Sequence, residues 1–196
     1  NKISYKYSTK DWENLDLSEA DSNDWQYAIE IFKNRFETRF FKPIESLSTS
    51  TDSTVKYSCG FIIMSLDCML LETFNQFYHG INSSDEKFNP NINTFNDILT
   101  RSEYFNKDFN NLDIVKVFYK QIRCGLVHQT ETGGESKINI KNNKLITITH
   151  KGNDLNIEIN RNEFHDRVIK YFKGYIEDLK NPLEIRLRNN FKIKMD

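Results

Sequence analysis

The sequence is poor in cysteine, and this excludes several kinds of site. It has only three cysteines in 196 residues, Cys59, Cys68 and Cys124. They are odd in number, lie in apolar or helical surroundings and match no zinc-binding spacing. The histidines are scattered and pair with no carboxylate or thiol at metal-ligand spacing. We therefore expect free thiols in a reducing cytosol, with no metal and no cofactor.

The sequence also lacks an excess of charge of either sign. Twenty-seven Lys and Arg face 28 Asp and Glu, which gives a formal net charge of -1. Non-specific binding of nucleic acid depends on accumulated basic residues, so a surface that binds nucleic acid all over is excluded. Any contact with RNA or DNA must be local.

Long hydrophobic runs are missing as well. Residues 1–21 contain no apolar core of the kind that a secretory signal needs, and the most apolar run, residues 59–71, is too short to cross a bilayer and contains Asp67. We expect a cytoplasmic protein with no membrane partner.

What the sequence does have is helical periodicity. The length fits one domain, and we interpret residues 1–196 as one unit with a polar lead-in over 1–20 and helices over 21–132. The first helix bends near Pro43, the second ends at Gly80, and a short helix lies around residues 95–99. The third helix follows from apolar residues at helical spacing, namely Val115, Phe118, Tyr119, Ile122 and Leu126.

The pattern changes at residue 133. Residues 133–160 alternate apolar and polar side chains, which predicts an inserted three-stranded antiparallel β-meander with a loop at 142–144 and a second turn at Lys151 and Gly152. Residues 161–181 return to helical spacing and end before Pro182. The tail, 182–196, keeps one parity and predicts a strand with a basic side, made of Arg186, Arg188, Lys192 and Lys194.

The end of the third helix carries the residues that point to chemistry. Arg123 and His128 lie five residues apart, which on an ideal helix separates them by about 140° and roughly 7.5 Å along the axis. Gly125 lies between them, and we expect it to end or loosen the helix and to turn His128 back toward Arg123.

An Arg beside a His suits cleavage of RNA. The ribose 2′-hydroxyl serves as nucleophile, so a base must take its proton, an acid must protonate the leaving 5′-oxygen, and a cation must stabilise the phosphorane. Histidine can do either proton transfer near neutral pH, and Arg can bind phosphate oxygens in a fork. One His cannot do both jobs on opposite sides of one phosphorus. A two-fold dimer would supply two of each residue.

The run "RCGLVHQ", residues 123–129, resembles the Arg-x4-His motif of the HEPN superfamily (higher eukaryotes and prokaryotes nucleotide-binding), in particular its stand-alone prokaryotic and plasmid-borne members. The resemblance covers roughly residues 21–180. It implies a mainly α fold, a HEPN-like bundle of four to five helices with the motif near the end of the third. It also implies a metal-independent endoribonuclease that dimerises to build its site, often as a toxin or defence effector.

Carried over by position, Arg123 would be the cation that stabilises the phosphate and His128 the general acid and base. The commonest form of the motif has Asn or another polar residue after the Arg, whereas this chain has Cys124. We expect Cys124, Gln129, Asp67 and Glu72 to surround and orient the pair, with Asp67 the better of the two carboxylates because its neighbours are so apolar. Structural pairing of these acids remains the alternative.

The sequence therefore predicts an enzyme, a homodimer that cleaves single-stranded RNA and works in a toxin-antitoxin or other prokaryotic defence system. The expected protein partner is an antitoxin or another component of that system. One alternative is a catalytically inactive HEPN domain that binds RNA, a nucleotide or a protein. Another is a helical scaffold in a defence complex. The basic residues of the tail either extend an RNA groove or form the solvated face of an edge strand, and the second reading is favoured.

Overall fold

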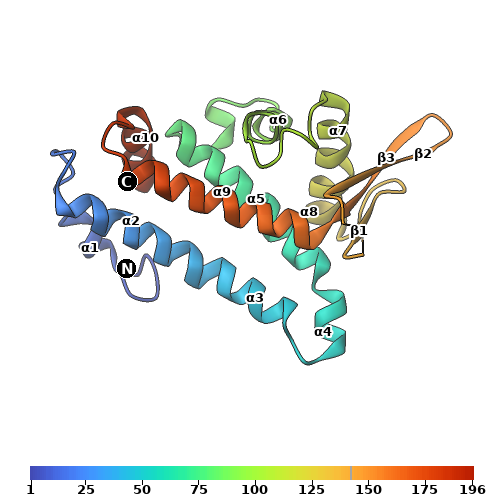
Figure 1. Cartoon of the computed structure of the whole chain (residues 1–196), viewed down its shortest axis with the longest axis horizontal. Coiled ribbons are helices and arrows are strands. Elements are labelled where there is room, and N and C mark those ends of the chain that lie inside the picture. Colours follow the sequence, from blue (N-terminus) through green and yellow to red (C-terminus); the bar gives the residue numbers. More distant parts are fainter. Residues whose placement is uncertain (142) are drawn as a thin grey trace.

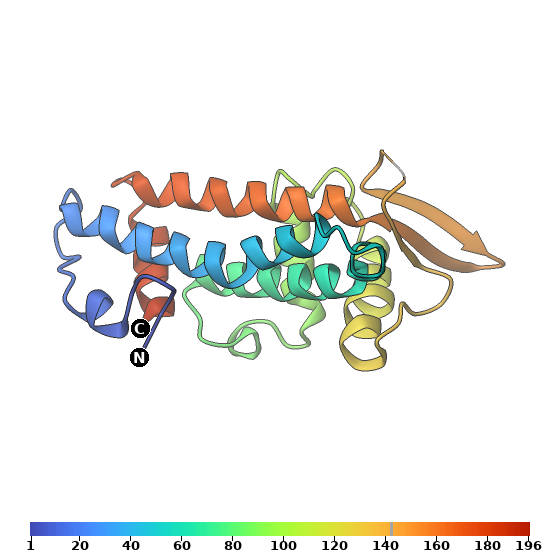
Figure 2. The ribbon, with the colours of Figure 1, turned by 90° about the horizontal axis from the view of Figure 1, so that it is seen from below.

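Three long helical segments run side by side through the body of the molecule (Figures 1 and 2). The computed structural model describes residues 1–141 and 143–196. The first segment consists of α2 (Asn23–Phe36), the π-helical segment η1 (Glu37–Phe41) and α3 (Lys42–Ser48). The second is α5 (Gly60–His79), which follows the short α4 (Ser53–Ser58). The third is α9 (Arg161–Lys180), and the prediction of a mainly helical chain is confirmed.

The first segment changes its helical type just before Pro43. Proline has no N–H and its ring clashes with the carbonyl four residues earlier, so the α-helical bonding pattern cannot continue unchanged. The backbone N–H of Lys42 donates to the carbonyl of Glu37, a π-type bond. The predicted bend near Pro43 thus corresponds to one π-helical turn inside a continuous helical segment.

A second layer covers one side of α5. It contains α6 (Ile92–Arg101) and the predicted third helix, which is built from α7 (Leu112–Val117), the π-helical segment η3 (Phe118–Cys124) and α8 (Gly125–Gln129). The remaining short elements are α1 (Thr9–Glu13) in the lead-in and the 3-10 turn η2 (Ser84–Glu86). Gly80 ends α5 in the left-handed conformation, with φ 64°, as predicted.

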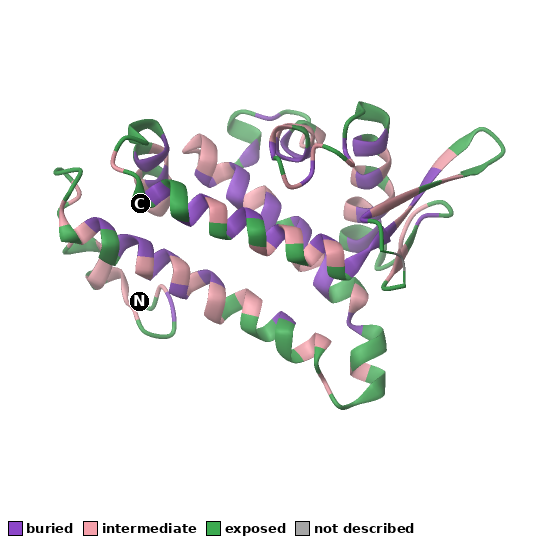
Figure 3. Cartoon of the chain, viewed as in Figure 1, coloured by how far each residue is buried: buried purple, intermediate pink, exposed green. Residues whose placement is uncertain are grey.

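The core is aromatic and joins four helices. Phe32 of α2 lies 4.8 Å from Phe77 of α5, 5.5 Å from Phe172 of α9 and 5.3 Å from Phe191 near the C-terminus, measured between ring centroids. These separations are typical of edge-to-face and tilted aromatic pairs. Figure 3 shows the buried residues gathered on the faces that the helices turn toward one another.

The predicted strand over residues 182–196 is wrong. The tail forms a helix, α10 (Ile185–Met195), packed on α5 and α9. Leu187, Phe191 and Met195 recur every four residues, so the one-parity pattern also satisfied a helix, and the helix buries Phe191 completely. No described strand lies near enough to pair with this segment, because β1–β3 lie at the other end of the molecule (Figure 1).

The predicted antiparallel meander is also wrong. The strands are β1 (Lys137–Asn139), β2 (Ile146–Lys151) and β3 (Asp154–Asn160), and they form a mixed sheet in the order β1-β3-β2. β2 and β3 form the expected antiparallel hairpin, with Lys151 opposite Asp154, whereas β1 pairs parallel with β3. Part of the predicted first loop, residue 142, lies outside the described residues.

The segment before β1 explains this topology. Ser136 donates from Oγ to Gln121 Oε1 and accepts at Oγ from the backbone N–H of Ile157 at 2.9 Å. The backbone N–H of Glu135 donates to Asn156 Oδ1 at 2.9 Å. These bonds anchor the entry to β1 against β3 on the edge away from β2, so β1 cannot pair with β2.

Candidate functional site

The third helix keeps its helical path through the Arg123 and His128 motif. Arg123 lies in the π-helical segment η3 and His128 in the last turn of α8, which ends at Thr130 with φ 58°. Gly125 is α-helical, with φ -57° and ψ -51°. The prediction that Gly125 ends or loosens the helix is therefore wrong, and the irregular turn precedes it.

Gly125 has a different role, which is to admit the returning chain. A Cβ at this position would lie 2.4 Å from the carbonyl oxygen of Glu131 and 3.0 Å from the backbone nitrogen of Gly133. The backbone N–H of Gly133 donates to the carbonyl of Gln121 at 2.6 Å, which holds the loop against the helix. The absence of a side chain thus lets the loop fold directly over the motif.

Arg123 is held on three sides. Its Nη2 donates to Glu72 Oε2 on α5 at 3.2 Å, and its guanidinium lies 5.7 Å from the ring centroid of Tyr119 and 6.0 Å from that of Phe95. Both charged side chains are less than a fifth exposed, at 17% and 19%. Burial alone would lower the pKa of Arg123, but the charge and hydrogen bond of Glu72 outweigh it and raise that pKa.

The guanidinium keeps donors for a ligand. Among the described residues, no nitrogen of Arg123 is both buried and without a hydrogen-bond partner. Each of its nitrogens is therefore either reached by solvent or bonded within the chain, and the side chain as a whole is 17% exposed. A guanidinium that is fixed in place and partly exposed suits phosphate recognition.

His128 is exposed on the surface of α8 and makes no hydrogen bond or ion pair with any part of the chain that the structure describes. Arg123 lies in the π-helical segment and His128 in the α-helical turn that follows it, and no hydrogen bond joins the two side chains in the described residues.

The two predicted carboxylates have different partners. Glu72 binds Arg123, as expected of a group that orients it. Asp67 does not contact Arg123: it is fully buried, and its Oδ1 lies 2.7 Å from Nδ1 of His165 on α9. Asp67 and Glu72 are five residues apart and project to different sides of α5, so the preference for Asp67 over Glu72 as the partner of Arg123 is wrong.

Cys124 and Gln129 are next to Arg123 and His128 in the sequence and do not cover them. Cys124 is partly exposed and directly follows Arg123 in the chain. Gln129 is exposed at the end of α8. Of the four residues expected to surround the motif, Glu72 has an ion pair with Arg123 in the described part of the chain.

The basic residues of the tail lie far from the motif. α10 and α8 are at opposite ends of the molecule (Figure 1). Arg188 is buried, lies 4.3 Å from the Trp25 ring centroid and donates to the carbonyls of Leu179 and Ala20 at 2.8 and 2.6 Å. The other three also lie on α10, where Arg186 donates to the Tyr78 hydroxyl, Lys194 donates to the Asn82 carbonyl, and Lys192 is partly exposed.

The sequence did not indicate the pairing of His165 with Asp67. Asp67 Oδ2 is buried and has no partner among the described residues. Burial raises the pKa of Asp67, although the hydrogen bond and charge of His165 act in the opposite direction. The isolated acid in an apolar helix was the available signal, but its partner lies 98 residues away along the chain.

Comparisons with known proteins identified no similar protein. A scan against protein-family models found no match, and searches of curated proteins and of solved structures found none either. Over the described residues, every helix is either too short or too polar to cross a bilayer.

Proposed function

We propose that the chain is a metal-independent endoribonuclease of the HEPN type that cleaves single-stranded RNA. The observation that carries the proposal is Arg123 itself: Glu72 holds its guanidinium at 3.2 Å, and the side chain stays partly exposed, at 17%. His128 is exposed one turn further along the same helix. The two residues are those that phosphoryl transfer by 2′-hydroxyl attack requires.

The reaction has one proton removed and one supplied. One His128 takes the proton of the 2′-hydroxyl, whose oxygen attacks phosphorus and forms the 2′,3′-cyclic phosphate. A second His128 gives a proton to the departing 5′-oxygen as the P–O bond breaks. Arg123 stabilises the added negative charge of the phosphorane.

Two chains are needed because one chain supplies one such His, and the reaction uses two proton carriers on opposite sides of the phosphorus. Exposed apolar side chains lie on the same side of α5 as Glu72. Met69 precedes Glu72 by three residues and follows Ile62 by seven, so the three share one face. Ile62 and Met69 are exposed, as is Val127 beside His128. Burial of these apolar side chains in a two-fold dimer would bring two motifs together.

A catalytically inactive HEPN domain that binds RNA, a nucleotide or a protein such as an antitoxin is the second candidate. The observation that favours it is the same ion pair, since a guanidinium already neutralised by Glu72 stabilises added negative charge less strongly than a free one. Cys124, in place of the common polar residue, is compatible with this reading. In either case we place the protein in the cytoplasm, in a defence or toxin-antitoxin system.

The test is cleavage of an unstructured, end-labelled RNA by the purified chain in EDTA. We expect cyclic phosphate ends, and a loss of rate of about 10²-fold or more in Arg123→Ala and in His128→Ala. His150→Ala is the matched control, because His150 is also exposed but lies on β2, and it should cleave normally. RNA retention without cleavage would support the binding domain instead, and neither binding nor cleavage would reject both.

The dimer is tested in the same preparation. Met69→Lys should shift the sedimentation coefficient to that of a monomer and abolish cleavage with it. Ile193→Lys, at an equally exposed position on α10, should leave both unchanged. A monomer that cleaves RNA at full rate would contradict the composite site.

A further inference from the structure

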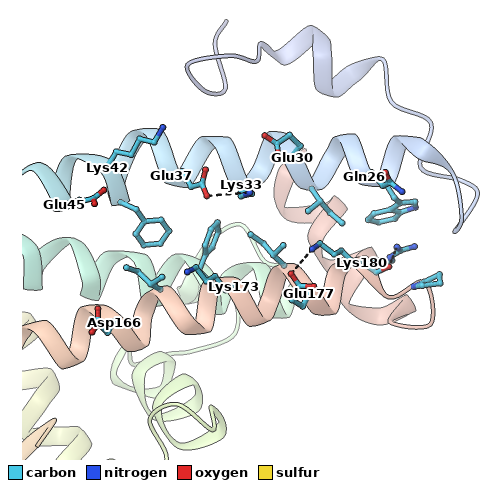
Figure 4. A pocket seen from close by; sticks show the side chains of 18 of the residues that line it. Gln26, Glu30, Lys33, Glu37, Lys42, Glu45, Asp166, Lys173, Glu177 and Lys180 are labelled. Carbon is cyan, nitrogen blue, oxygen red and sulfur yellow. Dashed lines mark hydrogen bonds and ion pairs between the residues drawn. The ribbon is translucent and has the colours of Figure 1, made fainter.

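A groove runs between the first segment, α2 to α3, and helix α9. Its volume is about 1130 Å³, of the order of ligand pockets in proteins. Figure 4 shows the labelled charged side chains along the two helices that flank it. The stretch of α9 that lines it, from His165 to Lys180, is about 22 Å long at 1.5 Å per residue. The groove is long, and it lies on the opposite side of α9 from the third helix.

The floor of the groove is apolar and recessed. It is formed by Ile29, Phe41, Ile169, Phe172 and Ile176. Phe172 is only 3% exposed, and Ile29 and Ile176 are 6% exposed. An amphipathic helix, about 10 Å across with side chains, needs a wider and more exposed apolar surface. A slender molecule can reach this floor.

The rims exclude a strongly charged ligand. Six carboxylates and five Lys or Arg side chains line the groove, and two of the ion pairs, Lys33 with Glu37 and Glu177 with Lys180, lie within the rims themselves. A surface with balanced charge has no long-range attraction for a polyanion such as RNA. The groove therefore suits an uncharged ligand and is distinct from the Arg123 site.

One end of the groove has a polar group held for binding. His165 lines the groove, and its Nδ1 is occupied by Asp67, so Nε2 is the nitrogen left for a ligand. With Asp67 ionised and His165 neutral, Nε2 accepts a hydrogen bond. With one more proton on the pair, Nε2 donates. A hydroxyl group can match both states because it donates and accepts, whereas a carboxylate only accepts.

We propose that this groove binds an uncharged, slender amphiphile, a long-chain alcohol in chemical class, with its hydroxyl on Nε2 of His165 and its chain along the floor between α2 and α9. The site is independent of RNA cleavage. Trp25 lines the other end of the groove, where its Nε1 is buried without a partner among the described residues. Its fluorescence should therefore report a bound chain.

The experiment titrates dodecanol into the Trp12→Phe variant, in which Trp25 is the remaining tryptophan. We expect a saturable change in Trp25 emission. Dodecyl methyl ether, which cannot donate a hydrogen bond, and dodecanoate, which is charged, should bind at least about tenfold more weakly. Equal binding of all three, or no saturation below the solubility limit of the alcohol, would overturn the proposal.

Two sets of variants locate the site. Ile169→Lys should abolish the change, whereas Ile185→Lys, exposed on α10 and outside the groove, should not. The double variant Asp67→Val with His165→Leu removes both polar partners together, which is tolerated better than removing one. It should bring the alcohol and the ether to equal affinity. Binding that survives Ile169→Lys would place the ligand elsewhere, and Arg123→Ala should bind dodecanol normally whatever becomes of the nuclease.

Discussion

At the scale of single residues, contacts with neighbouring elements restrict which side chain fits at a position. Gly125 is the clearest case, because two backbone atoms of the return loop occupy the space of a Cβ. Arg123 is another, since Glu72, Tyr119 and Phe95 come from three different elements and surround one guanidinium. The sequence indicated Arg123 as a site residue but gave no sign of the aromatic contact with Phe95.

Gly125→Ala should destabilise the fold by about 1 to 3 kcal/mol. The new Cβ would lie 2.4 Å from a carbonyl oxygen, and this overpacking exceeds the roughly 1 kcal/mol that alanine gains in a helix. Urea unfolding measures the loss. Gly60→Ala is the control, because its Cβ would meet nothing closer than 3.8 Å, and it should be neutral or slightly stabilising. Equal stability of the two variants would contradict the close approach of the loop.

At the scale of elements, the spacing of apolar residues predicted each long helix before residue 182. It failed in the tail, where the same spacing fits both a strand and a helix. Residues 185–195 satisfy both a strand and a helix, since apolar side chains four apart share a face in either. The choice was made by Phe32 and Phe77, which offer Phe191 a buried aromatic site that only a helix packed there can fill. The mixed sheet was decided in the same way, by Ser136 and Asn156.

The helical tail can be tested directly, because a strand and a helix would bury Phe191 and Ile193 to different extents. In a strand they would share a face, whereas in α10 Phe191 is fully buried and Ile193 is half exposed. We expect Phe191→Ala to cost about 3 to 5 kcal/mol in the free energy of unfolding and Ile193→Ala to change it by less than about 0.5 kcal/mol. Similar losses in both would favour the strand.

At the scale of the whole molecule, α5 connects two polar sites on different sides of the bundle. Glu72 faces the third helix and holds Arg123, while Asp67 faces α9 and holds His165. Asp67 lies within the most apolar run of the sequence, and Glu72 directly follows that run. The local sequence does not indicate which residue each acid pairs with, because Arg123 and His165 lie on helices far along the chain.

The buried Asp67 should change how the free energy of unfolding depends on pH. Because burial raises its pKa in the folded state, the unfolded state loses its proton first, at about pH 3.8. The stabilisation from the neutral acid is complete below that pH and is lost as the pH rises through the folded pKa. The stability of the wild type relative to Asp67→Asn should therefore fall as the pH is raised from 4 toward neutral.

Urea unfolding of both proteins at a series of pH values measures this difference. Glu19→Gln, at an exposed position, is the control and should show no comparable trend. A relative stability that rises with pH would mean that the ion pair with His165 outweighs the cost of burying the carboxylate.

The sequence alone determined the long helices before residue 182, the hairpin of β2 and β3, and the position of Arg123 and His128 on the last turns of the third helix. These follow from spacing and local backbone preference, which act over a few residues. The tertiary structure decided the rest: that the tail is a helix, that β1 joins the far edge of β3, that Arg123 binds Glu72, and that Asp67 binds His165. Each of these depends on contacts between residues distant in the chain, whose free energy no local pattern contains.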